Sequence, residues 1–93
     1  MTSKRNFKIL IVDDEKDYRE VFKMILSDEG YWVSSASSGE DALNILKREN
    51  INLVLTDLIM PKMDGMQLLE RIKKEYADTE VIVVTGYGTI ETA

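Results

Sequence analysis

Short apolar runs alternate with amphipathic stretches along the chain. Four β-strands are predicted by the apolar runs at residues 7–12, 31–36, 52–57 and 80–85. The first run is apolar at nearly every position, and so is the third until its end, which is typical of strands covered on both faces. The stretches between the runs repeat their apolar residues at the spacing of a helix face.

Three helices are predicted between these strands. The first covers residues 14–29 and has Gly30 as its C-terminal stop. The segment SSGE at residues 37–40 resembles a capping box that opens the second helix, and Asp64 in DGMQ can cap the third. The residues expected to face inward are Tyr18, Val21, Phe22, Ile25 and Leu26, then Ala42, Leu43, Ile45 and Leu46, then Met66, Leu68, Leu69, Ile72 and Tyr76.

This order of elements predicts an α/β fold. Repeated β-α units form a parallel sheet with right-handed crossovers and helices on its faces. Ligands of such sheets bind beyond the carboxyl ends of the strands. The side chains that matter most therefore follow the strands directly: Asp13 and Asp14 after the first, Asp57 after the third and Thr85 after the fourth.

Composition narrows the class of function. The chain has 93 residues, which is enough for a single domain covering residues 1–93. A net charge of −5 argues against direct contact with nucleic acid. Cysteine and histidine are absent, which excludes a thiolate nucleophile, the commonest general base and the usual zinc ligands. No apolar run approaches membrane length, so we expect a cytoplasmic protein without a membrane segment.

Carboxylates crowd the ends of the predicted strands. Like charges raise each other's pKa unless a cation lies among them. If the first, third and fourth strands are neighbours, Asp13, Asp14, Asp57 and the Thr85 hydroxyl converge, and oxygen ligands of this kind suit Mg²⁺. Singly, Asp14 is equally well explained as a helix cap, Asp57 as a residue entering a loop, and Thr85 as an ordinary strand residue. Their joint position at strand ends favours the metal site.

The chemistry expected at such a site is phosphoryl transfer. The acidic residues after the first strand would repel a bare phosphate, so a mononucleotide site of the flavodoxin type is not expected. A phosphoryl group can enter if a metal bridges it to the carboxylates. Asp57 could then act as the nucleophile and form an aspartyl phosphate. Thr85 could donate a hydrogen bond to the attached phosphoryl oxygen.

Three segments resemble the receiver domain of bacterial two-component response regulators. They are IVDDE after the first strand, LTDLIMPKMDG around the third and VVTGYGTIETA around the fourth, and the last is similar to receivers of sigma-54-dependent activators. The resemblance extends from Lys8 onward. It implies a flavodoxin-like, doubly wound parallel sheet with strand order 2-1-3-4. It also implies a truncated receiver in residues 1–93, which lacks strand five and helix five.

The resemblance assigns a role to each candidate residue. Asp57 would be the phosphoacceptor and would take its phosphoryl group from a sensor histidine kinase. Asp14 would bind Mg²⁺ directly, Asp13 through water, and Ile59 through its backbone carbonyl. Thr85 would contact the phosphoryl group when the domain switches.

The truncation leads to two further expectations. The family's strand-five lysine has no counterpart, and Lys62, the nearest cation by sequence, is expected to be a solvated loop charge. Strand four would be a bare apolar edge, and part of the apolar stripe of the first helix would be uncovered. We therefore expect a homodimer or a strand-exchanged oligomer formed through strand four.

Three functions compete at this point. The first is the Mg²⁺-dependent phosphoacceptor receiver. The second is an aspartyl-phosphate phosphatase, which would need an acid two residues after Asp57, where this chain has Ile59; we therefore expect no enzyme. The third is an interaction and dimerisation module with impaired phosphorylation, which the missing lysine favours.

Overall fold

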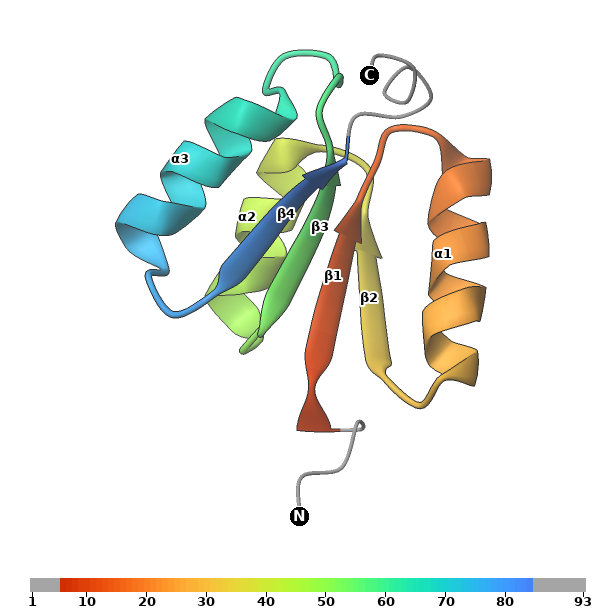
Figure 1. The fold of residues 1–93 in the computed structure, drawn as a ribbon. Helices are drawn as coiled ribbons and strands as arrows, with labels where there is room; N and C mark the ends of the chain where they lie inside the picture. Colours follow the sequence, from red (N-terminus) through yellow and green to blue (C-terminus); the bar gives the residue numbers. More distant parts are fainter. Residues whose placement is uncertain (1–5, 85–93) are drawn as a thin grey trace, which may run out of the picture.

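A computed structural model describes residues 6–84 of the chain, and strands and helices alternate throughout (Figure 1). The strands are β1 (Lys8–Val12), β2 (Trp32–Ala36), β3 (Leu53–Asp57) and β4 (Glu80–Val84). The helices are α1 (Lys16–Asp28), α2 (Gly39–Arg48) and α3 (Gly65–Glu75). Each predicted element is present, with ends about two residues or less from the prediction.

The four strands form one parallel sheet in the order β2-β1-β3-β4, as predicted. Its register places Val12 opposite both Ala36 of β2 and Thr56 of β3, and it places Asp57 opposite Val84 of β4. The carboxyl ends of β1, β3 and β4 therefore share one rim of the sheet. This rim carries the residues that follow the strands.

The main core lies between the sheet and the pair α2 and α3, on one face of the sheet (Figure 1). Alternate strand residues point into it, because successive side chains of a strand face opposite sides. Partly buried Val81 of β4 also packs against this cluster. The buried members are Leu10, Val12, Ala36, Ala42, Leu43, Ile45, Leu46, Ile51, Val54, Met60, Leu68 and Ile72.

Among residues 6–84, the elements that the structure describes cover only half of the opposite face of the sheet. Helix α1 packs on β1 and β2 there, where Ile9 and Ile11 are buried. The outward residues of β4 on that face, Ile82 and Val84, are 50% and 42% exposed. No residue of α1 is buried, although its apolar stripe was predicted to face inward. We call this uncovered half, made of α1 side chains and the outward residues of β3 and β4, the open face.

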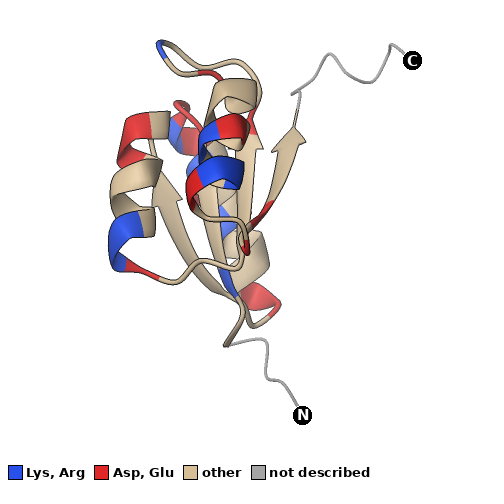
Figure 2. Ribbon diagram, turned by 90° about the vertical axis from the view of Figure 1, so that its left-hand side faces the viewer, with Lys and Arg blue, Asp and Glu red and all other residues tan. Residues whose placement is uncertain are grey.

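Two of the predicted helix caps are present. Asp64 accepts a hydrogen bond from the backbone N–H of Gln67 at 2.9 Å, and the Gln67 side chain accepts one from the backbone N–H of Asp64 at 3.0 Å, which completes a capping box. The Ser38 hydroxyl accepts a hydrogen bond from the backbone N–H of Asp41 at 3.1 Å. Helix α2 begins with acidic residues and ends with basic ones, which its dipole favours (Figure 2).

The prediction for one residue of α3 is wrong. Met66 was expected to face the core but is exposed, because it lies on the side of α3 away from buried Leu68 and Ile72.

None of the helices within residues 6–84 is both long and apolar enough to cross a membrane.

Two glycines allow close packing around α3 and α2. A Cβ atom on Gly65 would collide with the backbone of Asp57 and Leu58, lying 2.8 Å from the Leu58 Cα atom. A Cβ atom on Gly39 would lie 2.6 Å from the Met63 sulfur, which belongs to a flexible side chain and can move. Gly65 therefore couples the start of α3 to the end of β3, and the backbone there cannot give way easily.

We predict that Gly65→Ala lowers the free energy of unfolding by roughly 1–3 kcal/mol, the usual cost of forcing an atom into packed backbone. Gly39→Ala is the matched control and should cost less, because Met63 can rotate away. Urea unfolding of both variants measures the difference. Equal losses in the two variants would contradict the close contact inferred at Gly65.

Candidate metal and phosphoryl site

Three aspartates meet at the carboxyl end of β1 and β3. Each of Asp13, Asp14 and Asp57 offers one carboxylate oxygen, and these oxygens all lie within 4.8 Å of one another. The sheet register explains why these residues meet. Val12 of β1 lies opposite Thr56 of β3, and Asp13 and Asp57 are the next residues on the two strands. The structure therefore brings together the acidic residues that the sequence analysis selected.

Asp13 is held by three hydrogen bonds. Its backbone N–H donates to the Ala36 carbonyl at 3.1 Å, which extends the pairing of β1 with β2. Its carboxylate accepts from the backbone N–H of Glu15 at 2.9 Å. Its carbonyl accepts from the guanidinium of Arg19 at 2.8 Å. Asp13 is buried, and its orientation is fixed from both the sheet and α1.

Asp14 is exposed and does not cap α1. The residue at the N-cap position is Glu15, whose side chain makes no capping hydrogen bond. The capping explanation for Asp14 is therefore wrong. The position of Asp14 between a buried strand and a helix places its carboxylate beside those of Asp13 and Asp57 instead.

Asp57 ends β3 and is half-buried. The residues that follow it are fixed on both sides of the loop, because the backbone N–H of Leu58 donates to the Val84 carbonyl at 2.9 Å and the Leu58 carbonyl accepts from Gly65 at 2.8 Å. Ile59 is 73% exposed beside the carboxylate. The role of its carbonyl as a metal ligand stays a prediction.

This arrangement raises the pKa of the carboxyl groups of Asp13 and Asp57. Burial raises the pKa of Asp13, and the charges of Asp57 and Asp14 raise it further, against the hydrogen bond from Glu15 and the charge of Arg19. Burial likewise raises the pKa of Asp57, and the charges of Asp14 and Glu15 add to it, against a backbone hydrogen bond from Ile59. A cation at this site would remove the repulsion.

The three carboxylates line a cavity of about 560 Å³. One wall is acidic and the other is apolar, and the apolar wall belongs to the open face. No lysine or arginine lines the cavity within residues 6–84. Besides the aspartates, its lining residues are Ile11, Val12, Glu15, Tyr18, Phe22, Leu55, Thr56, Ile59 and Val84.

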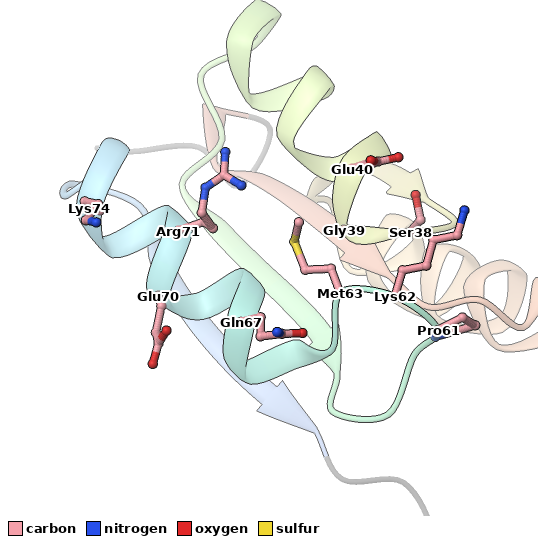
Figure 3. Close-up of a pocket in the computed structure, with 10 residues that line it drawn as sticks. All are labelled: Ser38, Gly39, Glu40, Pro61, Lys62, Met63, Gln67, Glu70, Arg71 and Lys74. Carbon is pink, nitrogen blue, oxygen red and sulfur yellow. The ribbon is translucent and has the colours of Figure 1, made fainter.

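Lys62 lies in a different place. Its backbone adopts a positive φ of 66° in the loop before α3. Its side chain extends beside Ser38 and lines a separate cavity of about 700 Å³ between α2 and α3 (Figure 3). Lys62 does not line the acidic cavity, which agrees with the expectation of a solvated loop charge.

The acidic cluster suits a hard divalent cation. It offers carboxylate oxygens from three residues and no nitrogen or sulfur ligand. Mg²⁺ takes one or two protein carboxylates and keeps water or phosphate oxygens at its other positions, so an open cavity beside the cluster fits it. The donor set therefore matches the predicted cofactor.

The structure adds two residues to the candidates and leaves one outside. Buried Thr56 lines the cavity directly before Asp57. Arg19 contacts Asp13 from α1. The sequence gives a signal for this contact, because Arg19 lies six residues after Asp13 and helix side chains lean toward the N-terminus of their helix. Thr85, the predicted phosphoryl contact, lies outside the described residues.

Comparison with known proteins decides the family. Residues 9–93 match the family described as "Response regulator receiver domain". The chain belongs to the response regulator receiver domain family. The family, the fold and the strand order predicted from the sequence are thus confirmed, and phosphoryl acceptance on an aspartate is the reaction associated with receivers.

Individual relatives support the same assignment. A probable transcriptional regulator ycf27 of Porphyridium aerugineum is 45% identical over 83 residues, which cover 89% of this chain and 34% of the relative. A putative response regulator NtrX-like of Rickettsia bellii is 44% identical over 87 residues, covering 91% of this chain and 18% of the relative. The receiver chain thus spans about a third of the length of the first relative and about a fifth of the second.

A solved structure has the same fold. The response regulator protein TrrA from Thermotoga maritima, in complex with Mg²⁺-BeF, superimposes with a TM-score of 0.83 at 36% identity. The match covers 92% of this chain and 75% of the TrrA chain. The described residues of the receiver therefore follow the fold of a protein whose structure contains Mg²⁺.

We predict that Asp57→Asn stabilises the metal-free receiver at pH 7. Because the pKa of Asp57 is raised on folding, the folded protein binds more protons than the unfolded one as pH rises above the ordinary value of 3.8. Between pH 3.8 and the pKa of Asp57 in the folded protein, the free energy of unfolding therefore falls as the pH rises. Above that pKa it falls no further. Removing the charge should raise the melting temperature at pH 7 and have little effect at pH 3.

Thermal unfolding followed by circular dichroism in EDTA checks this sign. Asp78→Asn, an exposed aspartate in the turn before β4, is the control and should change little at either pH. A lower melting temperature of Asp57→Asn at pH 7 would contradict the repulsion described above.

Proposed function

We propose that this receiver accepts a phosphoryl group on Asp57 from a histidine kinase in an Mg²⁺-dependent reaction. The observation that carries the proposal is the position of the Asp57 carboxylate, which lies with Asp13 and Asp14 at an open cavity where its oxygens can be approached. Backbone hydrogen bonds of Leu58 with Val84 and Gly65 hold the chain directly after Asp57, which would help to position the nucleophile.

The proposed step is a substitution at phosphorus. A carboxylate oxygen of Asp57 attacks the phosphorus of a phosphohistidine, and an O–P bond forms. The N–P bond breaks, and its electron pair stays on the imidazole nitrogen of the kinase, which takes up a proton. The product is an aspartyl phosphate, and no further co-reactant is needed.

Within this proposal the carboxylates hold the metal. Asp14 would bind Mg²⁺ directly and Asp13 through water, and Asp57 and the Ile59 carbonyl would be further ligands. The bound ion would neutralise the charge that develops on the phosphoryl oxygens. The raised pKa values of Asp13 and Asp57 and the Mg²⁺-BeF complex of the similar TrrA structure support this assignment.

We predict that a small phosphodonor with an N–P bond, phosphoramidate, adds one phosphoryl group to the intact chain in the presence of Mg²⁺. Mass spectrometry measures the gain. EDTA or Asp57→Asn should abolish it, because the metal or the nucleophile is then missing. Asp64→Asn, an aspartate that caps α3, should retain it.

The phosphoryl gain also separates this proposal from its alternative. A folded wild-type chain that binds Mg²⁺ but never gains mass would favour an interaction module with impaired phosphorylation. The absence of lysine and arginine from the cavity lining within the described residues is the observation that keeps this alternative in view.

A second proposal concerns self-association. Strand β4 is an edge of the described sheet, and its residues Ile82 and Val84 are exposed on the open face. Leu55 of β3 lies opposite Ile82 in the register and extends the same apolar surface. We propose that two copies associate through β4 and this surface, since exposed apolar strands at a sheet edge readily pair.

We predict that the wild-type chain elutes as a dimer or larger oligomer and that Ile82→Lys shifts it toward the monomer. A charge on the open face would have to be buried in the interface, which is costly. Trp32→Lys, an exposed residue of the opposite edge strand β2, is the control. Light scattering after size exclusion measures the mass, and a wild-type monomer at high concentration would contradict self-association.

A further inference from the structure

Arg19 of α1 contacts the acidic site without lining its cavity. Its guanidinium donates to the Asp13 carbonyl at 2.8 Å, across the turn that joins β1 to α1. Arg19 is half-buried, and it sits in the first turns of the helix, from which its long side chain reaches back toward the strand end. The contact spans six positions of the sequence and closes the turn that carries Asp13 and Asp14.

We infer that Arg19 is a positioning residue for the cation site, which rests on the Mg²⁺ binding proposed above. The peptide after Asp13 leads directly to Asp14, so the carbonyl that Arg19 holds fixes where the Asp14 carboxylate begins. The other contacts of Asp13 hold its N–H and its carboxylate and leave the carbonyl to Arg19. Without Arg19, this carbonyl loses the hydrogen bond that the structure gives it, and the peptide between the two aspartates is held less tightly.

Because Arg19 is positively charged, the direction in which Mg²⁺ affinity changes on its removal tests the inference. A cation near the site repels Mg²⁺, so by electrostatics alone the removal of Arg19 should tighten Mg²⁺ binding. A residue that positions ligands has the opposite effect, because partners of metal ligands typically contribute about 10-fold or more to affinity. The direction of the change therefore distinguishes the two effects.

Lys16 provides a matched control on the same helix. It is a cation one turn earlier and pairs with Glu20 at 3.9 Å, and both side chains are largely exposed. Such surface pairs contribute little to stability. Lys16→Gln removes the same charge as Arg19→Gln, at a similar place in the chain, without touching the contact to Asp13.

The test is isothermal titration of MgCl₂ into the intact chain and its variants at pH 7. We expect Arg19→Gln to weaken Mg²⁺ binding about 10-fold, Lys16→Gln to leave it unchanged or tighter, and Arg19→Lys to fall between the wild type and Arg19→Gln. Circular dichroism and the melting temperature in EDTA establish that each variant is folded. A purely structural role would lower the melting temperature and leave the affinity of the folded protein unchanged.

The outcomes separate this inference from the proposed function. If the wild type binds Mg²⁺ and Arg19→Gln binds equally well or more tightly, the positioning role is overturned and the metal site stands. If the wild type itself does not bind Mg²⁺, the metal part of the proposed function and the role of Arg19 both fall. If Arg19→Gln is unfolded, Arg19→Met decides, because it keeps the length of the side chain and cannot donate to the carbonyl, and wild-type affinity in that variant overturns the inference.

Discussion

The repulsion among three aspartates at one rim of the sheet is the constraint on which the rest of this structure depends. The register of β1 and β3 brings Asp13 and Asp57 together, and burial removes part of the water that would otherwise screen them. The rim stays in place because the sheet and α3 hold the backbone beside each carboxylate, through Asp13 and Ala36 on one side and Leu58 and Gly65 on the other. The folded protein thus holds charges together that would separate in a flexible chain.

The sequence was sufficient to predict the fold and to select the aspartates that the structure brings together. Short apolar runs can become only strands when amphipathic stretches of helix length separate them, and parallel pairing then sends every strand end to the same rim. Asp13, Asp14 and Asp57 could be selected for this reason before their distances were known. The preference of the cluster for a hard cation follows from its oxygen donors, which are also visible in the sequence.

Other features of the structure depend on tertiary contacts that the spacing of apolar residues in the sequence does not predict. The stripe of α1 has the spacing of a buried helix face, yet its burial depends on what covers the open face. Within residues 6–84, α1 packs mainly on β1 and β2, and none of its residues is buried. Asp14 has the residue type of a cap, but the chain turns one residue later, at Glu15. The contact from Arg19 needs the direction of a long side chain in addition to its position on the helix.

The open face and the acidic site are physically coupled, because they share a cavity. Tyr18, Phe22 and Val84 form its apolar wall, while Asp57 and its neighbours form the acidic one. Anything that covers the apolar wall also removes water from the carboxylates, which raises the cost of their charges in the absence of a cation. A bound cation removes that cost, so covering the open face and binding the cation favour each other by the same free energy. The position of the site at the border of an uncovered apolar surface therefore links its ionic state to whatever packs there.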